Sequence, residues 1–176
     1  PARTATVSCS GKKTMKPLTE RSRPSRAEPD PAPGGAAADT LPLKMLTIYT
    51  DGASRGNPGE AGAGVIIYDR QGTIVKKIKA SLGTTTNNVA EYMALIIALK
   101  EAVRLKADAL QLFSDSELMV RQLTGIYRVK DRKLQALAAE ARKLLSNFIR
   151  YDIVSVPRAQ NREADKLANL AIDEKE

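Results

Sequence analysis

The sequence contains no histidine, no tryptophan and a single cysteine, Cys9. One cysteine cannot form an intramolecular disulfide, and a chain without histidine has neither a Cys/His zinc site nor a histidine-dependent catalytic triad. No apolar run approaches the ~20 residues needed to cross a bilayer. These absences predict a soluble protein without a membrane partner, whose hydrolytic chemistry, if it has any, depends on carboxylates.

Positive charge is in excess, because 28 Lys and Arg residues against 20 Asp and Glu residues give a net charge of +8. This excess favours an anionic partner such as nucleic acid. The 176 residues suffice for one domain with a sizeable core. Residues 1–41 hold six of the nine prolines and none of the seven aromatic residues, a composition that cannot bury enough apolar surface to order itself. We therefore predict a disordered basic tail over residues 1–41 and one folded domain over residues 42–176.

The hydrophobic pattern of the domain predicts five strands and four helices. The expected strands are 44–51, 63–69, 73–82, 109–114 and 149–156, with a glycine-rich turn after the first, and the expected helices are 87–106, 117–123, 131–147 and 161–176. Asn87 and Asn161 are the expected N-caps of the first and last helices, and Tyr49, Tyr92 and Phe113 are expected in the core. The order β-β-β-α-β-α-α-β-α predicts an α/β fold with a mixed five-stranded sheet flanked by helices.

Four acidic residues stand where these elements begin or end. Asp51 ends the first strand and Asp115 follows the fourth, so their carboxylates emerge side by side if the two strands are parallel neighbours. Glu91 and Asp165 stand in the first turns of the first and last helices. Clustered carboxylates repel one another unless a cation neutralises them, and an all-oxygen ligand set favours Mg²⁺ or Mn²⁺. Two such ions about 4 Å apart could clamp a phosphodiester, which predicts a phosphodiesterase.

The segments around these acids resemble the four catalytic blocks of the type 1 class of ribonuclease H. They are 50–59 (TDGASRGNPG), 86–91 (TNNVAE), 114–116 (SDS) and 161–168 (NREADKLA), in the order of the family. The resemblance spans residues 44–172 and implies a ribonuclease H-like fold. It also implies a metal-dependent endonuclease that uses two Mg²⁺ or Mn²⁺ ions to cut the RNA strand of an RNA/DNA hybrid, leaving 5′-phosphate and 3′-hydroxyl ends.

The resemblance also assigns roles to individual residues. The four acids correspond to the metal-binding catalytic carboxylates of the family. Ser54, Asn57, Asn87 and Asn88 correspond to positions that contact the sugar-phosphate backbone, and Glu117 corresponds to a position, usually Gln, that contacts the minor groove. Short polar side chains in glycine-rich turns can reach the 2′-hydroxyl groups that distinguish RNA from DNA, which agrees with these roles.

The chain departs from the family pattern in two places. Many members carry a catalytic histidine in the loop before the last acid, where this chain has Pro157 to Gln160. We expect Arg158 in this loop to assist by its charge, because a guanidinium stays protonated and cannot act as a base. The basic, Trp-bearing protrusion of larger members is also missing, since only Thr124 to Lys130 separates the two middle helices. Some compact relatives also cut double-stranded RNA, which is therefore a second expected substrate.

Each acid also has a purely structural explanation. Asp51 alone could form a turn, Glu91 could complement a helix dipole, Asp115 could cap the following helix and Asp165 could be a solvated helix residue. Their joint occurrence favours an enzyme. The alternatives are a non-cleaving module of the same fold that binds hybrid or double-stranded RNA, and a related nuclease that resolves junctions or trims ends. We expect a monomeric, cytoplasmic protein.

Overall fold

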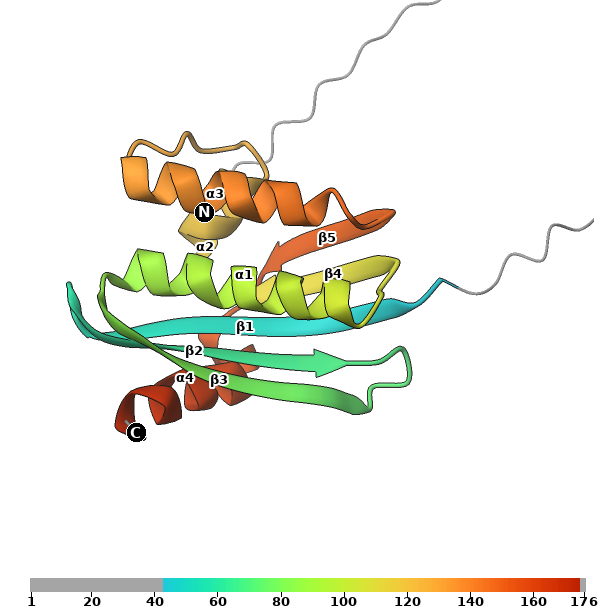
Figure 1. The fold of residues 1–176 in the computed structure, drawn as a ribbon, viewed down its shortest axis with the longest axis horizontal. Coiled ribbons are helices and arrows are strands. Elements are labelled where there is room, and N and C mark those ends of the chain that lie inside the picture. The colour runs from blue at the N-terminus through green and yellow to red at the C-terminus, as the bar shows by residue number, and fades with distance from the viewer. Residues whose placement is uncertain (1–42, 175–176) are drawn as a thin grey trace, which may run out of the picture. The chain divides into compact units, whose positions relative to one another are not determined.

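The computed structural model describes residues 43–174, which form a sheet with helices on both faces (Figure 1). The elements are β1 (Met45–Gly56), β2 (Gly59–Tyr68), β3 (Ile74–Thr85), α1 (Asn87–Arg104), β4 (Ala109–Ser114), α2 (Glu117–Leu123), α3 (Arg132–Leu145), β5 (Arg150–Ser155), the 3-10 turn η1 (Arg158–Gln160) and α4 (Arg162–Asp173). The strand order is β3-β2-β1-β4-β5, antiparallel from β3 to β1 and parallel from β1 to β5. The predicted mixed sheet is confirmed, while the predicted tail lies outside the described residues.

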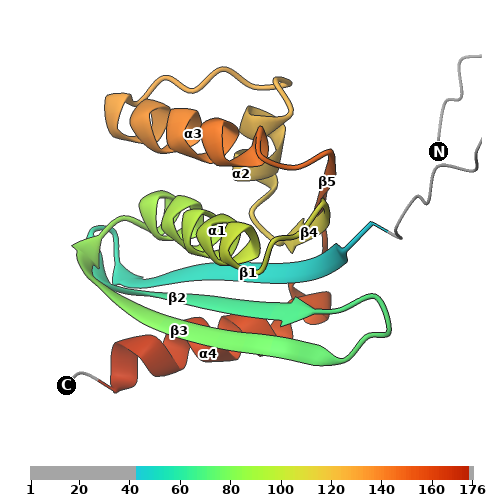
Figure 2. The same ribbon diagram turned by 45° about the vertical axis from the view of Figure 1, so that its right-hand side comes forward.

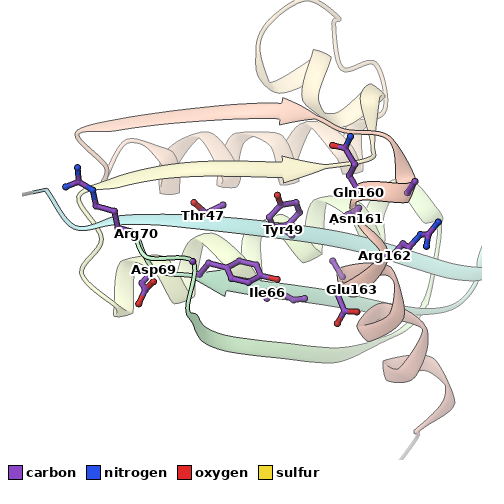
Figure 3. A pocket seen from close by; sticks show the side chains of 13 residues that line it. Thr47, Tyr49, Ile66, Asp69, Arg70, Gln160, Asn161, Arg162 and Glu163 are labelled. Atoms are coloured by element: carbon purple, nitrogen blue, oxygen red, sulfur yellow. The ribbon is translucent and has the colours of Figure 1, made fainter.

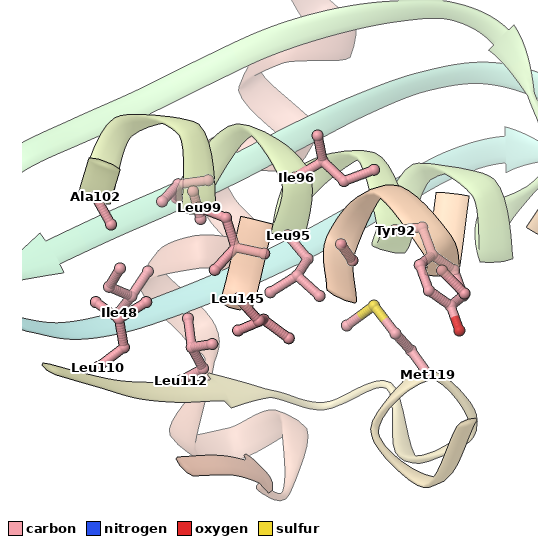
Figure 4. Packing of buried hydrophobic residues seen from close by; sticks show 14 of the residues in the cluster. Ile48, Tyr92, Leu95, Ile96, Leu99, Ala102, Leu110, Leu112, Met119 and Leu145 are labelled. Carbon is pink, nitrogen blue, oxygen red and sulfur yellow. The ribbon is translucent and has the colours of Figure 1, made fainter. Parts of the chain in front are cut away.

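Helices α1 and α3 lie on one side of the sheet and α4 lies on the other (Figure 2). Alternate residues of a strand point to opposite faces, so the apolar positions of β1 and β4 meet α1 in one layer. Fully buried members of this layer are Leu46, Ile48, Leu95, Leu99, Leu110 and Leu112 (Figure 4). Burial of each such side chain contributes about 1.5–3 kcal/mol to stability, which fixes α1 against the sheet. None of the helices within residues 43–174 is long and apolar enough to span a membrane.

Most of the glycine-rich segment forms strand, and the predicted turn is confined to Asn57 and Pro58. β1 and β2 pair through it as far as Gly56 and Gly59. Gly62 and Gly64 are there because α4 packs directly on β2: a Cβ on Gly64 would lie 2.1 Å from the Ala164 carbonyl oxygen. Glycines that were expected to form a turn therefore occur where a strand and a helix are in close contact.

One of the two predicted helix caps differs from the observed one, and the other lacks a capping hydrogen bond. The N-cap of α1 is Thr86, whose side chain accepts a hydrogen bond from the Val89 N–H at 3.4 Å, so the prediction for Asn87 was wrong by one residue. Asn161 does occupy the N-cap position of α4, but its side chain makes no capping hydrogen bond. That side chain is turned toward the sheet and has other partners, described below.

The sheet face that carries α4 is only partly covered. Tyr92 is buried in the core as expected, but Tyr49 and Phe113 are half-buried on this face, so the prediction of core positions for these two was wrong. Their rings stack with centroids 4.9 Å apart, and Tyr68 meets Tyr49 edge-on at 5.9 Å. α4 packs mainly against β2 and leaves this aromatic group at the edge of its footprint.

Candidate active site

Three of the predicted acids meet at the end of the paired part of β1 and β4. Thr50 lies opposite Ser114 in the parallel register, so Asp51 and Asp115 stand side by side where the pairing of β1 with β4 ends. Glu91 approaches from the first turns of α1. One carboxylate oxygen from each of Asp51, Glu91 and Asp115 lies within 4.8 Å of the others. Residues 40 and 24 positions apart in the chain thus form a single group of oxygen donors.

A close contact between β1 and α1 makes this arrangement possible. A Cβ on Gly52 would lie 2.2 Å from the Ala90 carbonyl carbon and from the Glu91 backbone nitrogen. The Gly52 N–H donates a hydrogen bond to Glu91 Oε2 at 3.2 Å. Glycine therefore lets the strand touch the helix backbone, and this contact sets the position of the Glu91 carboxylate beside Asp51.

The carboxylates of this group are hard to ionise without a counter-charge. Burial, followed by the charge of Asp115, raises the pKa of Asp51 to about 8. Burial, followed by the charge of Asp51, raises the pKa of Glu91 to about 9. Both side chains are under one-tenth exposed. A divalent cation would offset the repulsion, and its preference for hard oxygen ligands matches the donor set.

Asp165 lies beside this group and pairs with Arg158. The guanidinium of Arg158 contacts Asp165 Oδ1, and the two side chains are 73% and 25% exposed. Asp165 is not a member of the three-carboxylate group. After burial and Asp115, its charge raises the pKa of Asp51 further, and the charge of Arg158 lowers it. Asp165 and Arg158 thus act on Asp51 electrostatically, and a role for Asp165 as a metal ligand stays a prediction.

A polar cavity of about 460 Å³ opens at the acids. Its lining consists of Asp51, Gly52, Ala53, Ser54, Asn87, Glu91, Asp115, Ser116, Glu117, Leu118, Arg158 and Asn169. The predicted substrate residues Ser54, Asn87 and Glu117 are among them. The Ser54 hydroxyl donates to the Gly56 carbonyl at 2.7 Å, and Glu117 pairs with Arg121.

Asn57 and Asn88 lie in a neighbouring pocket instead. This pocket measures about 260 Å³, and Thr86 and Lys133 also line it. Asn57 Oδ1 accepts a hydrogen bond from the Asn87 N–H at 3.3 Å, which ties the β1–β2 hairpin to the start of α1. The predicted substrate residues therefore divide between two adjoining pockets around the N-terminus of α1.

Asn161 is the residue of this site that the sequence did not predict. Its side chain is 1% exposed, and its Nδ2 donates to the Thr50 carbonyl at 2.9 Å and to Asp115 Oδ1 at 2.8 Å. The sequence suggested only a helix cap. A polar residue at a helix start gives no sign that its side chain reaches two strand ends.

A larger cavity of about 610 Å³ lies on the partly covered sheet face (Figure 3). Tyr49, Tyr68 and Ile66 belong to its lining, and Arg70 and Arg162 lie toward opposite ends. Asp69 also lines it, but its carboxylate accepts hydrogen bonds from two backbone N–H groups of the β2–β3 turn. The three-carboxylate group does not extend into this cavity.

Comparison with known proteins agrees with this geometry. The family model described as "Reverse transcriptase-like" matches residues 49–171. Ribonuclease HI from Halobacterium salinarum is 45% identical over 126 residues, which cover 72% of this chain. The chain belongs to the ribonuclease H family. It spans 63% of the length of that archaeal relative.

Solved structures of the family have the same fold. The crystal structure of RNase H1 from Halobacterium salinarum matches with a TM-score of 0.73 and 44% identity, covering 74% of this chain and 99% of that one. LC11-RNase H1 in complex with an RNA/DNA hybrid matches with a TM-score of 0.69 and 42% identity, covering 73% of this chain and 96% of that one. The ribonuclease H-like fold expected from the sequence motifs is confirmed.

Proposed function

We propose that this protein is a metal-dependent endonuclease that hydrolyses the RNA strand of RNA/DNA hybrids. The observation that carries the proposal is the group formed by Asp51, Glu91 and Asp115, with one oxygen of each within 4.8 Å of the others. Membership of the ribonuclease H family and the similarity to LC11-RNase H1, which was solved with a hybrid, support this substrate.

The carboxylates would hold two Mg²⁺ or Mn²⁺ ions, with Asp165 as a fourth ligand. The donor set consists of oxygens only, which favours these ions over zinc. When bound, the ions would supply charge for activating a water molecule and for stabilising the leaving 3′-oxygen, and cleavage would then leave 5′-phosphate and 3′-hydroxyl ends. The raised pKa values of Asp51 and Glu91 support a cation as the missing counter-charge.

Arg158 takes the place of the histidine that other members of the family have. Its side chain is 73% exposed at the rim of the acid cavity and pairs with Asp165. A guanidinium keeps its proton, so Arg158 attracts the phosphate by charge and transfers no proton. The exposure of its side chain supports this role, because the phosphate can approach it without rearrangement of the fold.

The residues around the N-terminus of α1 position the substrate. Ser54 and Asn87 line the acid cavity, and Asn57 and Asn88 line the adjoining pocket. Their hydroxyl and amide groups donate to phosphate oxygens and 2′-hydroxyls, while Glu117 lies toward the minor groove. Double-stranded RNA also presents 2′-hydroxyls in a shallow minor groove, so we include it as a second substrate. The monomeric state and the cytoplasmic location stay predictions.

One assay tests the proposal. The protein is incubated with labelled RNA/DNA hybrid, double-stranded RNA, double-stranded DNA and a four-way junction, in Mg²⁺, Mn²⁺ or EDTA. Internal cuts in the RNA strand of the hybrid, absent in EDTA, are expected. Binding without cleavage in every reaction would instead identify a binding module, and cleavage confined to the junction would identify a resolvase.

A further inference from the structure

Asn161 connects the elements that carry three of the four acids. Its amide nitrogen donates to the carbonyl of Thr50, the residue before Asp51, and to Asp115 Oδ1. Its own carbonyl accepts the N–H of Asp165 at 3.0 Å. One buried residue thus contacts the end of β1, the carboxylate after β4 and the first turn of α4. Figure 3 shows it beside Gln160, where the chain enters α4.

The orientation of this amide is fixed by the chemistry of its partners. The Thr50 carbonyl and the Asp115 carboxylate can only accept hydrogen bonds, so only the NH₂ group can face them. The amide oxygen is then left buried, and no residue among 43–174 donates a hydrogen bond to it. A buried acceptor without a partner opposes stability. The side chain therefore contributes less to folding than a fully satisfied amide would.

We propose that Asn161 is a positioning residue for the carboxylates, and this inference rests on the proposed function. Its NH₂ group holds Oδ1 of Asp115, whose carboxylate is one of the three in the metal-binding group. The same NH₂ group holds the Thr50 carbonyl, so the ends of β1 and β4 keep a fixed separation. Hydrogen bonds of this kind orient carboxylate ligands in metal sites, and their loss typically costs about 10–100-fold in metal affinity or activity.

The first test measures metal binding without substrate. Asn161→Ala removes both donated hydrogen bonds, and we expect Mn²⁺ affinity, measured by calorimetry on the full chain, to fall about 10–100-fold. Gln122→Ala is the matched control, because Gln122 is also a buried amide, 5% exposed, whose side-chain oxygen accepts from the Tyr92 hydroxyl at 2.8 Å. This control should lower Tm and leave Mn²⁺ affinity unchanged.

The second test measures cleavage of the hybrid at saturating Mn²⁺. Asn161 is 1% exposed and is not in the lining of the acid cavity, so Asn161→Ala should lower kcat about 10-fold or more and change KM less than about twofold. If Asn161→Ala does not fold, Asn161→Ser replaces it, since a short hydroxyl cannot reach both acceptors. Asn161→Ser should then show the same losses of Mn²⁺ affinity and kcat in smaller measure.

The outcomes separate the two proposals. Suppose that an Asn161 variant folds and that its Tm falls as in Gln122→Ala. If its Mn²⁺ affinity and kcat equal those of the wild type, the positioning role is overturned and the nuclease proposal is left intact. If the wild-type protein binds Mn²⁺ with an affinity that depends on Asn161 but cuts no hybrid, the nuclease proposal is overturned and the positioning role is retained.

Discussion

The two principal cavities of this molecule differ in size and in chemistry, and the smaller one is the candidate active site. The cavity on the partly covered sheet face measures about 610 Å³ and has an aromatic floor that includes Tyr49 and Tyr68. The cavity at the end of β1 and β4 measures about 460 Å³ and contains three carboxylates with a common centre. Converging titratable groups with shifted pKa values therefore indicate the site better than volume does.

The difference arises over two residues of one strand. Tyr49 packs against the rings of Phe113 and Tyr68 on the neighbouring strands. Asp51 stands where α1, the end of β4 and the loop before α4 all converge, and it meets Glu91 and Asp115 there. The acid cavity gathers carboxylates from separate elements where the connectivity of the sheet reverses, whereas the floor of the larger cavity consists of rings on adjacent strands.

The largest expected effect is the loss of activity in Asp51→Asn. This change keeps the volume of the side chain and removes one charged oxygen donor, so cleavage of the hybrid should fall below about one-thousandth of the wild-type rate. Tyr68→Phe, in the larger cavity, should leave the rate unchanged. Steady-state kinetics in Mg²⁺ measure both variants. Appreciable cleavage by Asp51→Asn, or inactivity of Tyr68→Phe, would reverse the assignment of the two cavities.

The next largest difference between the two cavities is expected in the stability and kcat of glycine-to-alanine variants. Gly52→Ala forces a Cβ into the backbone of α1, so we expect a loss of about 1–3 kcal/mol in stability and about 100-fold in kcat, because Glu91 moves away from Asp51. Gly72 lines the larger cavity and has open space for a Cβ, but its φ is +81°. Gly72→Ala should cost about 1 kcal/mol through backbone strain alone and leave kcat unchanged. Thermal unfolding and kcat measured together test this contrast.

Arg158→Ala should have a smaller effect than either change. The guanidinium at the rim of the acid cavity attracts the phosphate, and we expect its loss to lower kcat about 10-fold with less change in KM. Arg70→Ala removes an equally charged side chain from the larger cavity and should change neither constant. A rise in KM with unchanged kcat for Arg158→Ala would reduce Arg158 to a binding role.

The sequence predicted the order of the elements and a site of four acids, of which Asp51, Glu91 and Asp115 form the observed group. Regular alternation located β4, whose observed bounds Ala109–Ser114 are the predicted ones, because an apolar strand between polar turns has few alternatives. Asp51 and Asp115 could be paired because parallel strands end at the same edge of a sheet. Both inferences need only periodicity and topology.

Other features depend on contacts that no local pattern encodes. The glycines after Asp51 resemble a turn in composition, but Gly52 is a strand residue packed against α1, and Gly62 and Gly64 are strand residues packed against α4. Asn161 resembles an N-cap, but its side chain bonds to Thr50 and Asp115, which are 111 and 46 residues away. Tertiary packing determines the structure at such positions, so these features could not be predicted from the sequence alone.

The prediction that concerns activity least is the stability of the metal-free protein as a function of pH. Asp51 and Glu91, with pKa values of about 8 and 9, keep protons in the folded state that the unfolded chain releases near pH 4. The folded state therefore binds more protons between about pH 4 and 8, and stability falls as pH rises through this window. Since the chain has no histidine, few other groups titrate between pH 5 and 8.

In EDTA, Tm should accordingly be lower at pH 8 than at pH 5.5 by about 4 °C or more. Saturating Mg²⁺ at pH 8 should recover most of the difference, because a cation at the carboxylates replaces the lost protons. Asp51→Asn should flatten the EDTA profile, whereas Tyr68→Phe should retain it. A Tm that rises with pH in EDTA would show that the carboxylates are ionised and paired with cationic groups of the fold. The contrast between the two cavities would then lose its electrostatic basis.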